Sequence, residues 1–136
     1  MEKGFEGGCF CGAVRYKSHA NSLAEFCCHC RDCQKKHGSA FATGIATLKN
    51  EVEISGNLHR YHMVADSGNN KYHLTCASCG FPIGEEITEM DNVLMISAGS
   101  LDDPALFQPQ AHFWVSSKQP WLVLDESIPE YAEQSE

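Results

Sequence analysis

The chain has 136 residues, 43% of them hydrophobic and 21% charged, with a formal net charge of −8. This length fits one domain, which we expect to span residues 1–136. The acidic charge speaks against a nucleic-acid or anionic-lipid partner, and no apolar run approaches the roughly 18 residues of a membrane-spanning helix. The first residues lack the apolar core of a secretory signal, so we expect a cytoplasmic protein.

Short runs with strand character recur along the chain between turn signals and predict a mainly β fold. They cover Ala13–Lys17, Ala40–Leu48, Glu51–Ile54, Leu58–His62, Tyr72–Thr75, Val93–Ser97 and His112–Val115. One short helix is expected over Cys30–His37, ended by Gly38. Asp102-Asp103-Pro104 predicts a turn that opens a second helical turn through Phe107. The acidic tail, residues 130–136, is expected to be loosely held.

The eight cysteines fall into three groups: Cys9-x-Cys11-Gly12, Cys27-Cys28-His29-Cys30-x-x-Cys33 and Cys76-x-x-Cys79-Gly80. A C-x-x-C sequence places two thiolates on one turn at a spacing that suits tetrahedral zinc. Cytoplasmic thiols stay reduced, which favours metal over disulfides, and a redox C-x-x-C would need a βαβ context that is absent here. The sequence therefore predicts two Zn²⁺ ions per chain.

Two pairs and a triplet divide naturally between two ions. The pairs, Cys9 with Cys11 and Cys76 with Cys79, would make a closed four-cysteine site of structural type. The triplet of Cys28, Cys30 and Cys33 would leave a fourth position open, which is typical of a reactive or ligand-binding zinc. Spacing alone leaves open which cysteines share which ion.

The remaining cysteine and the histidines have simpler interpretations. Cys27 could replace Cys28 as a ligand, although the simpler interpretation is that Cys27 is a plain buried thiol. His29 alternates with its neighbours and should point away from the metal, but it could also fill the fourth position or carry a proton. We interpret His37, His59, His62 and His73 as ordinary surface or core residues.

Several segments, in this order, resemble the glutathione-dependent formaldehyde-activating enzyme (GFA) family, which is related to the centromere protein V domain. They are Gly8-Cys9-Phe10-Cys11-Gly12-Ala13-Val14-Arg15-Tyr16, Cys28-His29-Cys30-Arg31-Asp32-Cys33, Gly38-Ser39-Ala40-Phe41, Cys76-Ala77-Ser78-Cys79-Gly80, Gly99-Ser100-Leu101-Asp102-Asp103-Pro104, His112-Phe113-Trp114 and Lys118-Gln119-Pro120-Trp121. The chain looks like the short, general members of the family.

The resemblance implies a single GFA-type zinc-binding domain with an Mss4-like fold, in which zinc holds coiled antiparallel sheets together. It implies a structural zinc on Cys9, Cys11, Cys76 and Cys79, and a catalytic zinc on Cys28, Cys30 and Cys33. The implied activity is that of a carbon–sulfur lyase, with glutathione as co-substrate. In the family reaction formaldehyde adds reversibly to glutathione to give S-hydroxymethylglutathione.

Three thiolates on zinc should bind a fourth thiolate well, and a glutathione thiolate held there would be placed to add to an electrophile. Glutathione is anionic, so an acidic protein needs a local cation to bind it. Arg31 is the first candidate, with Lys35 and Lys36 on the same helix and Arg60 a weaker one. The alternative function is a non-catalytic, zinc-stabilised protein-interaction module, in which His29, Cys27 or a partner residue closes the triplet.

Overall fold

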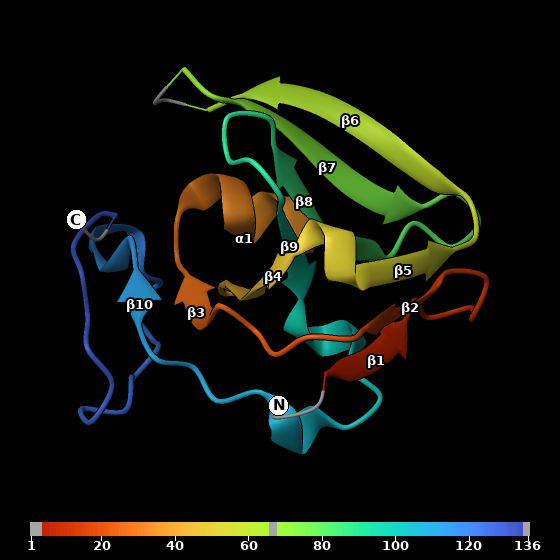
Figure 1. Ribbon diagram of the computed structural model, residues 1–136. Coiled ribbons are helices and arrows are strands. Elements are labelled where there is room, and N and C mark those ends of the chain that lie inside the picture. The colour runs from red at the N-terminus through yellow and green to blue at the C-terminus, as the bar shows by residue number, and fades with distance from the viewer. Residues whose placement is uncertain (1–3, 66–67, 135–136) are drawn as a thin grey trace.

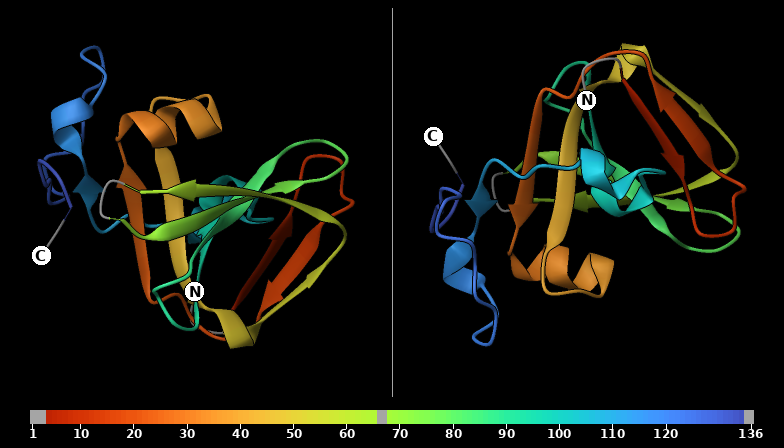
Figure 2. Two further views of the ribbon diagram at one scale, coloured as in Figure 1. Left: turned by 90° about the horizontal axis from the view of Figure 1, so that it is seen from above. Right: turned by 90° about the horizontal axis from the view of Figure 1, so that it is seen from below.

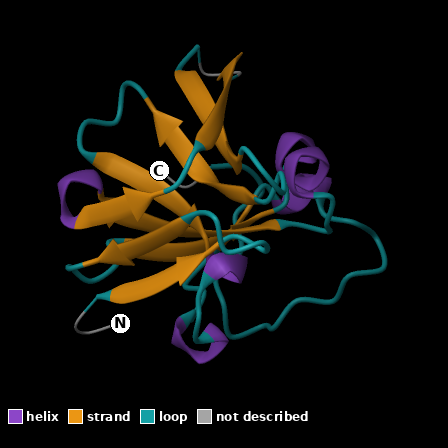
Figure 3. Cartoon of the chain, turned by 90° about the vertical axis from the view of Figure 1, so that its right-hand side faces the viewer, coloured by secondary structure: helices purple, strands orange, loops and turns teal. Residues whose placement is uncertain are grey.

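The structure is a computed structural model that describes residues 4–65 and 68–134 (Figure 1). Its elements are β1 (Phe5–Gly8), β2 (Arg15–Ser18), β3 (Ala24–Cys28), α1 (Arg31–His37), β4 (Ala42–Leu48), η1 (Lys49–Glu51), β5 (Val52–Ser55), β6 (Leu58–Val64), β7 (Asn70–Cys76), β8 (Pro82–Ile87), β9 (Val93–Ser97), η2 (Ala98–Ser100), η3 (Pro104–Leu106), β10 (His112–Phe113) and η4 (Val115–Ser117). Strands dominate, and short helices lie around them (Figure 3). The prediction of a mainly β fold with one short α-helix is confirmed.

The strands form two sheets of different size. The smaller sheet has the order β1-β2-β5, and the larger has the order β10-β3-β4-β9-β8-β7-β6. Neighbouring strands pair antiparallel, except that β10 pairs with β3 in parallel. Both views in Figure 2 place β10 and the C-terminal segment on the opposite side of the molecule from β1 and β2. In the described ranges, no helix has the length and apolar character needed to cross a membrane.

The main core lies between the two sheets. Phe5 and Tyr16 of the smaller sheet are buried against side chains of the larger sheet, among them Ile45, Leu74 and Ile96. The alternation of buried and exposed residues in β1 and β2 reflects the two-residue period of a strand with one face on the core. The Tyr16 hydroxyl lies 2.7 Å from the Ser100 hydroxyl, so its polar end is satisfied inside the core.

Three strands were not expected from the sequence: β1, β3 and β8. β1 ends in two glycines, and β8 reads Pro-Ile-Gly-Glu-Glu-Ile, so both contain residues that are depleted in strands. Tertiary pairing overrides this weak propensity, because β8 lies between β7 and β9 in the larger sheet. The expected turn at Asp103 is present as η3, where the Asp103 carboxylate accepts a 3.0 Å hydrogen bond from the Ala105 amide.

The described part of the C-terminal tail runs beside β10. The amide of Tyr131 donates to the carbonyl of His112 at 2.8 Å, and the amide of Trp114 donates to the carbonyl of Glu133 at 3.1 Å. These hydrogen bonds bring residues 130–133 against the strand, although the sequence predicts a loosely held tail. Residues 135–136 of that predicted tail lie outside the described residues.

Candidate metal centres

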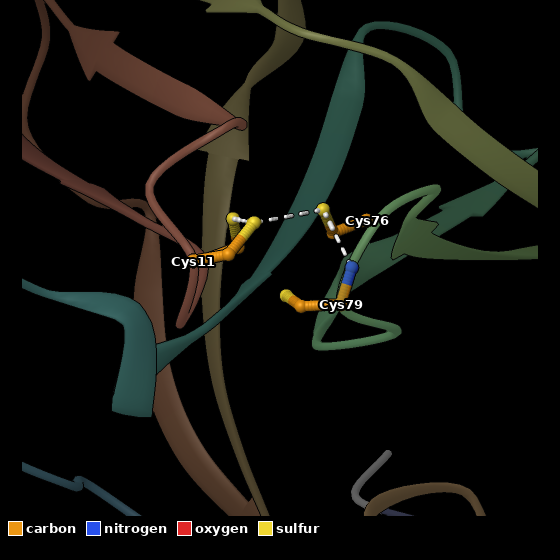
Figure 4. A group of neighbouring side chains, drawn as sticks. Cys11, Cys76 and Cys79 are labelled. Carbon is orange, nitrogen blue, oxygen red and sulfur yellow. Dashed lines mark hydrogen bonds between the residues drawn. The ribbon is translucent and has the colours of Figure 1, made fainter.

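The first cysteine group joins the turn after β1 to the turn after β7. Cys9 and Cys11 follow Gly8, whereas Cys76 ends β7 and Cys79 lies in the turn before β8. The four sulfur atoms all lie within 4.8 Å of one another. Figure 4 shows the Cys11 sulfur facing those of Cys76 and Cys79 across a small gap. The structure therefore brings together the two pairs that the sequence assigns to a closed site.

This group fits a zinc ion by its spacing. A tetrahedral site with Zn–S bonds of about 2.3 Å has sulfur–sulfur edges of about 3.8 Å. The sulfurs of Cys9 and Cys11 are 3.6 Å apart, and those of Cys11 and Cys76 are 3.8 Å apart. Four thiols packed at these distances suit a thiophilic metal, and a closed shell of four protein ligands is typical of a structural zinc.

Backbone amides also prepare this group for thiolates. The amide of Val14 donates to the Cys9 sulfur at 3.3 Å, and the amide of Cys79 donates to the Cys76 sulfur at 3.4 Å. Gly80 has φ +77°, a left-handed conformation that closes the C-x-x-C turn and favours glycine. Each turn thus directs donors at sulfur, which stabilises a negative charge there.

The second group lies where β3 leads into α1. Cys28 ends β3, Cys30 is the N-cap of α1, and Cys33 lies in its first turn. Their sulfurs lie within 4.8 Å of one another, and no other His, Cys, Asp or Glu among the described residues joins them. This group could therefore offer a metal three protein ligands, with one position left for another molecule.

Hydrogen bonding concentrates negative charge on one sulfur of this group. The thiols of Cys28 and Cys33 donate to Cys30 and, with the Cys33 amide at 3.2 Å, lower the pKa of Cys30 to about 2. Hydrogen bonding with Cys28, and next with Cys30, raises the pKa of Cys33. One thiolate is thus favoured even without a cation, and a metal would favour the other two.

Cys27 and His29 lie outside both groups. Cys27 is buried, and burial raises the pKa of its thiol to about 11. His29 is fully buried, its Nε2 lies 2.9 Å from His112 Nδ1, and burial lowers its pKa to about 4. Its ring also packs on Phe41, with centroids 5.0 Å apart. Both residues therefore fit the simpler structural interpretation.

Two cavities adjoin α1. A small one, with about 60 Å³ of space, is bordered by Cys28 and Cys33 and lined mostly by apolar or small residues of β3, β4, β8 and β9. A more open one of about 380 Å³ is lined by Arg31, Lys35 and Gln119 together with the end of α1. The cysteine triplet thus has space beside it, as a site for a small ligand requires.

The basic residues that the sequence offers as anchors for an anionic ligand have different partners. Arg31 lines the open cavity and donates to the side-chain oxygen of Gln34. Lys36, one of the expected anchors, is instead paired with Glu85 of β8, and both side chains are largely buried. Arg60 forms a bidentate pair with Glu86 at 3.0 and 3.2 Å. Arg31 and Lys35 are therefore the cations placed to meet an anionic ligand beside α1.

Two residues of the small cavity were missed by the sequence reasoning. His37 was interpreted as ordinary, although its position four residues after Cys33 places both on one face of a helix. Glu85 lies on β8, which was not predicted as a strand, so no local signal connected it with the cysteines. Both residues line the cavity that Cys28 and Cys33 border.

Comparisons with known proteins agree with this architecture. Residues 4–117 match the family described as glutathione-dependent formaldehyde-activating enzyme. A crystal structure of a Rhodobacter sphaeroides protein is similar, with a TM-score of 0.58 and 20% sequence identity over 76% of this chain and 96% of that chain. At that identity the likeness shows the fold alone. The comparison with curated proteins found no match. The family match covers most of the chain and includes all seven cysteines of the two groups, so the chain belongs to the glutathione-dependent formaldehyde-activating enzyme family.

Proposed function

We propose that the protein is a zinc-dependent carbon–sulfur lyase that acts on glutathione or a related thiol adduct. The observation that carries this proposal is the triplet of Cys28, Cys30 and Cys33, to which the described residues add no fourth ligand. These three residues would hold the catalytic zinc. When bound, the ion would supply an open coordination position that lowers the pKa of an incoming thiol.

Cys9, Cys11, Cys76 and Cys79 would hold the second zinc. Four thiolates leave no position for a substrate, so this site would contribute to stability rather than to chemistry. It would join the β1–β2 turn to the β7–β8 turn and thereby connect the smaller sheet to the larger one. This division of roles leaves the reaction to the triplet.

The chain's own residues can bind and orient the thiol substrate. Arg31 follows Cys30 directly and lines the open cavity, where its guanidinium can meet a carboxylate of glutathione. Lys35 lines the same cavity and adds positive charge to it. Anchoring the peptide carboxylates there would bring the cysteine sulfur of glutathione toward the triplet, which raises its effective concentration beside the electrophile.

The reaction itself is a reversible addition. The thiolate sulfur donates an electron pair to the carbonyl carbon, a carbon–sulfur bond forms, and the π pair of the carbonyl moves to oxygen, which takes up a proton. In the reverse direction the hydroxyl loses that proton and the carbon–sulfur bond breaks. The electrophile that best fits the family description is formaldehyde, which gives S-hydroxymethylglutathione.

The test is glutathione titration by calorimetry, combined with the rate of adduct formation from glutathione and formaldehyde. We expect Cys30→Ser to lose both thiol binding and acceleration, because it removes one of the three sulfurs that would hold the catalytic zinc. The matched control is Cys27→Ser, which changes a neighbouring cysteine outside the group and should retain both. A wild-type protein that binds zinc but neither binds glutathione nor accelerates the reaction would contradict the proposal and favour the interaction module.

A further inference from the structure

The small cavity beside the triplet has a histidine and a glutamate in a lining of mostly apolar or small residues. Apart from cysteine, His37 and Glu85 are the residues of this lining with ionisable side chains. Phe26, Met95 and Ile96 are among the apolar residues that surround them. An electrophile entering this space would therefore contact Cys28 and Cys33 of the triplet as well as these two groups.

His37 is held in this cavity by its place on α1 and by β7. It is the last residue of α1, four positions after Cys33, so the two side chains share one helix face. Its ring meets His73 of β7 edge-on, with centroids 5.8 Å apart and an interplanar angle of 81°. Packing against His73 of β7 holds the His37 imidazole on the helix face that also carries Cys33.

Glu85 is held in place by its contacts with Lys36 and His73. Its carboxylate accepts from the Lys36 ammonium, and the two side chains are 14% and 11% exposed. The same carboxylate oxygen lies 3.9 Å from His73 Nδ1, a buried nitrogen without a hydrogen-bond partner in the described structure. Because Lys36 of α1 pairs with Glu85 of β8, the Glu85 carboxylate is held as a negative charge near the rings of His37 and His73.

We propose that His37 is the proton carrier of the lyase site, and that Glu85 and Lys36 are positioning residues that hold its surroundings. This inference rests on the proposed function. In the direction of synthesis, His37 takes the S–H proton of glutathione, and the freed sulfur pair forms the bond to carbon. The carbonyl π pair moves to oxygen, and His37 returns the same proton to that oxygen. Protons and electrons balance without another reactant.

The charges around His37 suit this cycle. Burial lowers the pKa of His37, so the ring is neutral near pH 7 and can accept a proton. The charged or titratable groups around it are Lys36 of α1, Cys30 at the N-cap of α1, His73 of β7 and Glu85 of β8. His73 and Lys36 oppose a positive charge on the ring, whereas Glu85 and Cys30 favour it. Such a balance keeps proton uptake and release both accessible.

The first test compares His37→Gln with His59→Gln, which alters an exposed histidine on β6 away from the cavity. We expect His37→Gln to keep its zinc content and glutathione dissociation constant but to lose about 100-fold or more in the rate of adduct formation and cleavage. In the wild type the rate should fall as the pH falls through the pKa of His37, because a protonated ring cannot accept the thiol proton. The remaining rate of His37→Gln should lack this pH dependence. His59→Gln should behave as the wild type.

A second readout does not depend on turnover. In wild-type protein, the imidazole NMR signals of His37 should shift when the unreactive S-methylglutathione is added, whereas those of His59 should not. This measurement also serves if His37→Gln fails to fold. An active wild type with an equally active His37→Gln, or no shift of His37, would overturn the proton-carrier role and leave the proposed function standing. A wild type without any acceleration would overturn both.

Discussion

Single residues decide which cysteines can meet a metal. Cys27 and Cys28 are adjacent in β3, so their side chains point to opposite faces of the sheet. Cys28 therefore joins Cys30 and Cys33, whereas Cys27 is buried away from them. The same logic separates His29 from the triplet, since it lies between two ligand candidates and contacts His112. A one-residue shift of register would exchange the metal-binding and core positions.

Arg31 can be tested at the same scale. Replacing it by alanine should raise the dissociation constant of glutathione about tenfold, equal to about 1.4 kcal/mol, because one charged contact with a carboxylate is lost. The wild-type constant should also rise with salt, and the variant's should rise less. Calorimetry at two salt concentrations measures both effects. Lys17→Ala is the control, since it removes an exposed charge on β2; equal constants for wild type and Arg31→Ala would exclude the anchor role.

At the scale of elements, α1 organises the candidate site. Its N-cap and first turn supply Cys30 and Cys33, its last residue is His37, and Lys36 joins it to β8. Gly38 ends the helix with φ +60° and ψ +37°, and its amide donates to the carbonyl of Gln34. The positions of the triplet and of the adjoining cavity thus depend on how this short helix begins and ends.

The helix end predicts a specific stability difference. Gly38→Ala should lower the free energy of unfolding by about 1 kcal/mol, because an added Cβ destabilises the left-handed conformation. A Cβ at Gly38 would meet no atom within 4 Å, so the cost would come from backbone strain alone. Gly99→Ala is the matched control, because Gly99 has equal space and no positive φ. Urea unfolding of the zinc-loaded variants would show it, and equal losses in both would contradict the argument.

At the scale of the whole molecule, features that depend on local sequence were predictable, whereas features that depend on the pairing of distant strands were not. The cysteine groups were recognisable because metal-ligand spacing is local, and the helix because Gly38 ends it. The strands β3 and β8 were not, because their sequences carry weak strand signals and gain their form from neighbours in the larger sheet. The sequence therefore did not predict Glu85 as a residue of the site, since it is the strand order β7-β8-β9 that brings it to the cavity.

The two cysteine groups should differ in how they respond to loss of metal. Cys9, Cys11, Cys76 and Cys79 connect distant turns between the sheets, and four ligands should hold zinc more tightly than three. The triplet lies at one helix start, where losing its ion would leave both sheets paired. The fold should therefore depend on the first group and the chemistry on the second.

Stepwise chelation tests this division most directly, with zinc counted by elemental analysis and folding followed by far-ultraviolet circular dichroism. We predict two zinc ions per chain as isolated. A mild chelator should remove one ion and abolish glutathione binding while the β-sheet signal persists, and only stronger chelation should remove the second and unfold the protein. Release of both ions in a single step together with unfolding, or a protein that holds only one, would contradict the account.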